Sequence, residues 1–293
     1  MAVSRLRFKS TGTGTKYIDL AKALTLQERR LHRQKQIYTV YGGYYVDSNG
    51  SRIDLNVAPL NWVSKLAVNR AFKMWKKMTA MTLKDASATS KSRYRDFKVY
   101  LNQGMGAAPL LPLDAAGNNL YATAGEWDYT TLVTADPEGP GGGTPDAFDL
   151  QIVGPSVAGG GGGDNWNRVG IMQSWFDSRP QPESTQPDNI PNVSDPLMNL
   201  FDTGDVIDDR LTYINDENDQ PPYDEATTFG NAAAYAATSN LQRVSTAFTT
   251  SANAVVPIHG FQALCGLIQL EFAGNDPGAY ELVLDVETKG ESF

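Results

Sequence analysis

Short stretches in which every second side chain is apolar recur along the chain and limit the folds that it can adopt. Residues 96–102 and 146–154 alternate in this way, and a period of two is typical of strands with one buried face. Residues 38–57 hold two β-rich runs around Ser48-Asn49-Gly50, which predict a β-hairpin. Further strands are expected in several stretches, the last two of them paired around the turn at 273–278: 126–134, 168–176, 241–249, 265–272 and 279–286.

Loops rich in Gly, Pro, Asn and Asp separate these stretches, among them 138–146, 159–165 and 178–196. Many short strands with long loops indicate an antiparallel sandwich, and such loops within one domain usually make contacts or carry function. We therefore predict a mainly β protein: an antiparallel, jelly-roll-like sandwich over residues 37–293 with helical and long-loop insertions. Its part from about 103 to 230 is acidic and loop-rich, and residues 1–36 are expected to form a basic N-terminal arm and helix.

Charge is distributed very unevenly along the chain. Residues 1–103 hold 20 Lys and Arg against 6 Asp and Glu, a net charge of +14. Residues 104–293 hold 5 basic residues against 27 acidic ones, a net charge of −22. Such asymmetry suggests a basic region that meets a polyanion and an acidic body that faces elsewhere.

The basic region contains three elements that could contact phosphate. Residues 1–15 are polar and are expected to form an arm without packing of its own, and residues 17–35 have helical spacing. Residues 61–81 give the strongest helix prediction, with Asn61 as N-cap and no internal Gly or Pro. The candidate nucleic-acid-binding residues in these three elements are Arg5, Arg7 and Lys9; Arg29, Arg30, Arg33 and Lys35; and Lys65, Arg70, Lys73, Lys76 and Lys77.

On the helix at 61–81, the five cations fall within an arc of about 140° at 100° per residue. The opposite side carries Val63, Ala67, Ala71, Met74 and Met78. Besides phosphate binding, this pattern fits an ordinary solvated helix face or binding to a membrane surface. Aromatic residues interleaved with the cations could stack on unpaired bases or could serve the core: Trp62, Phe72, Trp75, Tyr94 and Tyr100.

Catalytic motifs are not evident. His32 and His259 are the only histidines, and Cys265, the only cysteine, is expected to be a small buried side chain. The Gly-rich segments lack the Gly-Lys-Ser/Thr pattern of a phosphate loop, and no motif singles out a pair of carboxylates for glycoside hydrolysis. We therefore do not expect an enzyme or an organic cofactor.

Acidic runs at 201–210 and 215–225 could supply oxygen ligands to a calcium or magnesium ion at a subunit boundary. Neither run has the spacing of a calcium-binding loop, so solvated surface is the alternative interpretation. The candidate metal ligands are Asp205, Asp208, Asp209, Asp216 and Asp219.

A membrane role is not expected, because no stretch of about 18 uncharged apolar residues occurs. The first residues, MAVSRLRFKSTGTGT, lack the apolar run of a secretory signal. The protein is therefore expected to be soluble and made inside the cell.

Six segments of the sequence together carry a resemblance to a known protein family: VDSNGSRIDLN (46–56), GEWDY (125–129), FDLQIVGP (148–155), DPLMNLFDTGD (195–205), NDQPPYD (218–224) and GFQALCGLIQLEF (260–272). In this order they resemble capsid proteins encoded by small circular single-stranded DNA viruses from environmental samples. The resemblance covers roughly residues 36–293. Such capsids commonly begin with a dense Arg-rich arm, whereas the cations of residues 1–16 are dilute here.

The resemblance implies a jelly-roll subunit that binds copies of itself, forms an icosahedral shell and encloses a single-stranded genome without sequence specificity. The protein would then reside in the virion. The alternative from another class is a β-sandwich binding module whose acidic loops recognise a carbohydrate or a protein. Gel filtration separates the two, because a capsid protein gives particles and a module gives a monomer or small oligomer.

Overall fold

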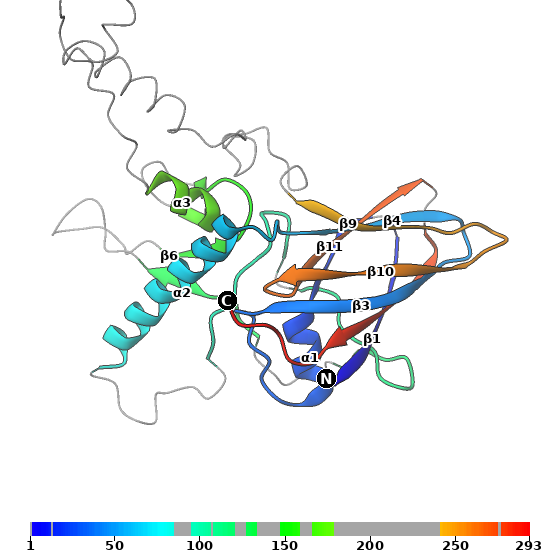
Figure 1. Cartoon of the computed structure of the whole chain (residues 1–293), viewed down its shortest axis with the longest axis horizontal. Coiled ribbons are helices and arrows are strands. Elements are labelled where there is room, and N and C mark those ends of the chain that lie inside the picture. Colours follow the sequence, from blue (N-terminus) through cyan, green and yellow to red (C-terminus); the bar gives the residue numbers. More distant parts are fainter. Residues whose placement is uncertain are drawn as a thin grey trace, which may run out of the picture.

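The computed structural model describes residues 2–12, 14–84, 95–106, 108–120, 127–133, 147–158, 166–178, 241–274 and 277–293. Within these residues, two four-stranded antiparallel sheets form a β-sandwich (Figure 1). The strands of the first sheet, in spatial order, are β1 (Val3–Thr11), β12 (Ala279–Glu287), β3 (Ile37–Val46) and β10 (Val255–Leu264). Those of the second are β2 (Lys16–Asp19), β11 (Leu267–Gly274), β4 (Ser51–Val57) and β9 (Gln242–Phe248). The prediction of a mainly β, antiparallel sandwich is confirmed.

The sandwich strands pair in a nested order along the chain. The first strand, β1, pairs with the last, β12, and β2 pairs with β11. Inside these pairs, β3 pairs with β10 and β4 pairs with β9. Consecutive strands therefore alternate between the sheets, except at β4 and β9, which flank a long insertion.

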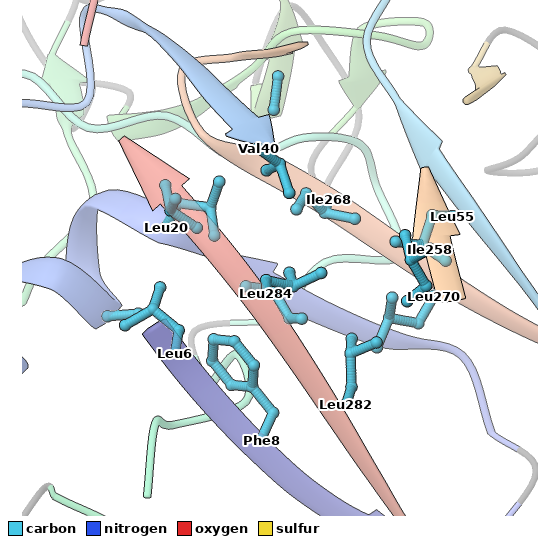
Figure 2. Packing of buried hydrophobic residues seen from close by; sticks show 14 of the residues in the cluster. Leu6, Phe8, Leu20, Val40, Leu55, Ile258, Ile268, Leu270, Leu282 and Leu284 are labelled. Atoms are coloured by element: carbon cyan, nitrogen blue, oxygen red, sulfur yellow. The ribbon is translucent and has the colours of Figure 1, made fainter. Parts of the chain in front are cut away.

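One apolar core lies between the two sheets and includes residues from every sandwich strand. Alternation along each strand sends one set of side chains inward, and burying a Leu or Phe side chain contributes about 1.5–3 kcal/mol. Figure 2 shows the converging side chains: Leu6 and Phe8 of β1, Leu282 and Leu284 of β12, Val40, Leu55, Ile258, Ile268, Leu270, and Leu20 from helix α1 (Leu20–Glu28).

The insertion between β4 and β9 carries two helices and a small third sheet within its described residues. Its elements are α2 (Trp62–Thr82), β5 (Thr131–Val133), β6 (Ala147–Gln151), β7 (Val157–Ala158), β8 (Trp166–Gly170) and α3 (Ile171–Asp177). A second apolar cluster joins α2 to this sheet and to the β10–β11 turn, where Cys265 is fully buried as predicted. The helices consequently sit at one end of the sandwich (Figure 1).

Two predicted hairpins are wrong. The strands that flank Ser48-Asn49-Gly50, β3 and β4, belong to different sheets, and so do β11 and β12 on either side of 273–278. The turn itself is present, with Gly50 at a φ of 74°. A turn motif reverses the chain, but which strand then pairs with which depends on the face that each strand must bury.

Most of the other strand predictions hold, with three exceptions. Strands β6, β9, β11 and β12 lie in stretches where strands are expected. Residues 126–134 contribute only the short β5, and residues 168–176 divide between the end of β8 and helix α3. Residues 96–102 form no strand beyond an isolated bridge at Tyr100, although their alternate apolar side chains are buried as expected.

The unpacked arm predicted for residues 1–15 is wrong. Residues 3–11 are the edge strand β1, which pairs along its whole length with β12. Leu6 and Phe8 are fully buried, while Arg5, Arg7 and Lys9 alternate with them on the outer face. Because the outward-facing cations make the composition of this segment polar, the composition alone does not reveal its two buried residues.

The helix predicted over residues 17–35 is also shorter than expected. Residues 16–19 form β2, and helix α1 covers Leu20–Glu28. Arg29 ends the helix in the left-handed conformation, with a φ of 55°. The cations at positions 29–35 therefore lie in the connection to β3 and share no helix face.

Candidate nucleic-acid interface

Helix α2 begins at a capping box. The Asn61 side-chain oxygen accepts a hydrogen bond from the Ser64 backbone N–H at 2.8 Å, and the Ser64 hydroxyl accepts one from the Asn61 N–H at 3.2 Å. These bonds satisfy N–H groups that a helix start otherwise leaves unpaired, which stabilises the helix by about 1 kcal/mol. The predicted helix and its cap are confirmed.

One side of α2 is buried against the second apolar cluster. Val63, Ala67 and Ala71 are buried, as the helical pattern predicts. Met74, which the pattern places on the same side, is 54% exposed, because the later turns of α2 project past the body of the insertion (Figure 1). The fully buried residues of α2 are therefore confined to its first three turns, and Trp75 in the next turn is half-buried against the same cluster.

The opposite side of α2 is cationic. Lys73, Lys76 and Lys77 are exposed and Lys65 is half-buried. The sequence has no Asp or Glu between Asp54 and Lys84, and no ion pair among the described residues involves an α2 lysine. Within the part of the chain that the structure describes, this face therefore carries positive charge that no carboxylate pairs with, which suits a phosphate-binding surface.

Arg70, the fifth predicted cation of α2, serves a different purpose. Its guanidinium donates to the Ser174 carbonyl oxygen at 3.2 Å and to the Ser178 hydroxyl. Both acceptors lie at the end of α3, so Arg70 fastens α3 to α2.

Lys35 lies beside α2 although it comes from the connection before β3. Its ammonium group sits over the Phe72 ring at 5.2 Å and over the Phe293 ring at 5.0 Å, and it donates to the Phe293 carbonyl oxygen at 2.5 Å. Burial lowers the pKa of Lys35, and the nearby positive charge of Lys73 lowers it further. Lys35 thus adds positive potential next to α2, but its ammonium group is largely engaged.

The cations of β1 are paired with carboxylates. Arg5 contacts Asp285 through two hydrogen bonds of 2.7 and 2.8 Å, and Arg7 contacts Glu281 at 2.7 Å. The Arg5 guanidinium lowers the pKa of the Asp285 carboxyl group. Of the three predicted arm cations, only Lys9 is exposed without an ion pair to another described residue. Arg5 and Arg7 therefore take part in ion pairs within the first sheet, and a contact of either residue with nucleic acid stays a prediction.

The cluster predicted around Arg29 is also divided. Arg30 forms an ion pair with Glu28 at 2.8 Å, while Arg29 and Arg33 are exposed. His32, between these cations in sequence, is buried and contacts Glu28 at 3.0 Å. Figure 1 shows α1 and β1 apart from α2, so the twelve predicted cations do not form one surface.

The predicted metal ligands Asp205, Asp208, Asp209, Asp216 and Asp219 lie outside the described residues. Among the residues that are described, no group of three or more His, Cys, Asp or Glu side chains could hold a metal ion. A divalent cation at a subunit boundary stays a prediction.

A buried carboxylate that the sequence does not single out lies at the start of α1. Asp19 accepts a hydrogen bond from the Lys22 backbone N–H at 3.0 Å and acts as the N-cap. Its second oxygen accepts from the Gln34 amide at 3.0 Å, the Trp127 indole at 3.1 Å and the Tyr129 hydroxyl at 3.4 Å. Burial raises the pKa of Asp19, and these donors partly offset the effect. The network ties the insertion to the sandwich.

Comparison of the chain with protein-family models, with curated proteins and with solved structures finds no match. No helix in the described ranges is long and apolar enough to cross a membrane. The geometry of α2 is therefore the main basis for a functional proposal.

Proposed function

We propose that this chain is a viral capsid protein that assembles with copies of itself into an icosahedral shell and packages a single-stranded DNA genome. The observation that carries the proposal is the face of α2, where Lys65, Lys73, Lys76 and Lys77 form no ion pair with any residue that the structure describes. Contacts between such cations and phosphate supply most of the sequence-independent affinity for nucleic acid.

The strand pairing supports the shell part of the proposal. A jelly roll consists of eight strands in two sheets, and it arises when a long antiparallel ribbon wraps so that the first strand meets the last. The nested pairs β1–β12, β2–β11, β3–β10 and β4–β9 support a jelly roll, because the first strand also pairs with the last here. Viral capsid domains are a common use of this architecture, and several phrases of the sequence resemble those of such capsids. Fold alone does not define function, so the proposal depends on α2 as well.

The charge distribution supports the same interpretation. On the first sheet, carboxylates of β12 neutralise Arg5 and Arg7, so little free positive charge remains there. A shell subunit needs one basic surface for the genome and other surfaces for its neighbours and the solvent. Concentrating the unpaired lysines on one helix meets this need.

Assembly is the experiment that tests the proposal. The full chain, expressed and purified with and without added single-stranded DNA, is examined by gel filtration and by negative-stain electron microscopy. Closed particles of uniform diameter are expected, and particles formed with DNA should absorb more strongly at about 260 nm than protein alone. A monomer or small oligomer under every salt and pH condition would contradict the capsid proposal and favour a binding module.

A further inference from the structure

Four of the aromatic residues interleaved with the cations are described by the structure, and Trp62 differs from the other three in its exposure. Phe72 and Trp75 stack on each other and pack around Phe97, with ring centroids 5.7–5.9 Å apart. Tyr100 is buried and stacks on another ring. Trp62, in contrast, is 52% exposed at the start of α2.

The Trp62 indole is held in place by α3. It meets the Trp175 ring edge to face, with ring centroids 5.4 Å apart and an angle of 84° between the planes. Arg70 fixes α3 through its bonds to Ser174 and Ser178. The indole is therefore positioned before any ligand arrives, which reduces the entropy cost of binding.

Trp62 also lies in line with the lysines. At 100° per residue, Trp62, Leu66, Lys73 and Lys77 fall within a strip about 60° wide along one side of the helix. Lys73 is about 17 Å beyond Trp62 along the helix axis, and Lys77 is about 6 Å further. A ligand lying along this strip would meet an aromatic ring and an exposed Leu at one end and cations at the other.

We propose that Trp62 is a base-stacking residue and that the α2 face binds unpaired nucleotides in preference to duplex. This inference rests on the proposed function, because it assumes that the α2 lysines contact phosphate. In a duplex the faces of the bases are covered by their neighbours, whereas an unpaired base can leave its stack and lie on the indole. Stacking of this kind tolerates any sequence, because every base has a π face.

The test compares Trp62→Ala with the parent full-length protein by fluorescence anisotropy. Three labelled probes are used: a 20-nucleotide oligo(dT), the same oligonucleotide with abasic sites throughout, and a 20-base-pair duplex. Trp62→Phe is the conservative variant, and Met81→Ala is the matched control, because Met81 is 68% exposed on the same helix outside the strip. Circular dichroism and urea unfolding establish that each variant is folded.

We expect Trp62→Ala to bind oligo(dT) about 5- to 150-fold more weakly, the range for removal of one stacked base. Its salt slope should stay that of the parent, because no cation is removed. Binding of the abasic and duplex probes should be unchanged, Trp62→Phe should recover most of the affinity, and Met81→Ala should behave like the parent.

Equal reductions in affinity for oligo(dT) and for the abasic probe, or no reduction for either, would overturn the stacking role. Anionic phospholipid vesicles are titrated with the same variants as a fourth ligand, and a reduction confined to them would also overturn the stacking role and would identify a membrane-surface helix. A different result is expected if the proposed function itself is wrong. Replacing the α2 lysines would then leave the affinity and the salt slope for every probe unchanged.

Discussion

Replacing Lys65, Lys73, Lys76 and Lys77 together by Gln should remove much of the salt dependence with which the protein binds single-stranded DNA. Removing one contact between a lysine and a phosphate lowers the slope of log K against log salt by about 0.7 on single strands, so four such contacts correspond to about 2.8. Lys65 is half-buried, and if it does not reach a phosphate the three exposed lysines still account for about 2.1.

Folding should survive these substitutions. Lys and Gln have nearly equal helix propensities, and none of the four side chains belongs to the apolar cluster that holds α2. Lys73 and Lys77 are also like charges one turn apart, so neutralising them relieves a repulsion of a few tenths of a kcal/mol. The unfolding midpoint should therefore stay the same or rise slightly.

The assay is fluorescence anisotropy with a labelled oligo(dT) at several salt concentrations. A matched pair of double variants removes two positive charges each: Lys73→Gln with Lys77→Gln, and Arg5→Gln with Arg7→Gln. The first should lower the slope by about 1.4. The second should leave it nearly unchanged, because Asp285 and Glu281 already neutralise these arginines. A parental slope and affinity in the quadruple variant would refute the reasoning and reduce the α2 face to solvated surface.

Two further predictions concern stability. The Gly43→Ala variant should unfold at markedly lower urea concentration than the parent or fail to fold, because a Cβ atom at Gly43 would overlap the backbone carbonyl of Val283 in the paired strand. The control is Gly14→Ala, because a Cβ atom at Gly14 meets no neighbouring atom. Equal stability of the two variants would contradict this account. Burial lowers the pKa of His32 below 6.5. Just below pH 6.5 the unfolded chain therefore binds a proton at His32 that the folded chain does not bind. The free energy of unfolding should consequently rise as the pH increases through this range. Urea unfolding as a function of pH should show a flatter profile for His32→Gln, and an unchanged profile would exclude His32 as the source.

The sequence by itself determines the local features of this protein. Helix α2 follows from its apolar spacing, from Asn61 at its start and from the absence of internal Gly and Pro, and the structure confirms both the helix and its cap. Strands β6, β11 and β12 follow from an apolar residue at every second position. The cations of α2 are also evident from the sequence. These features depend on residues within a few positions of one another, so a local pattern is enough to predict them.

The tertiary structure alone decides which strands pair and which charges are free. The turn at Ser48-Asn49-Gly50 has the local signal of a hairpin, yet β3 pairs with β12 and β10 because its buried face belongs to the first sheet. The sequence presents Arg5 as one more cation of a basic arm, whereas β1 places it opposite Asp285, 280 residues away. The exposure of Trp62 likewise depends on how α3 packs beside it, and the burial of Asp19 depends on residues 127–129. Contacts between residues so distant in sequence leave no periodic signal, because they are fixed only when the two sheets and the insertion bury their apolar faces together.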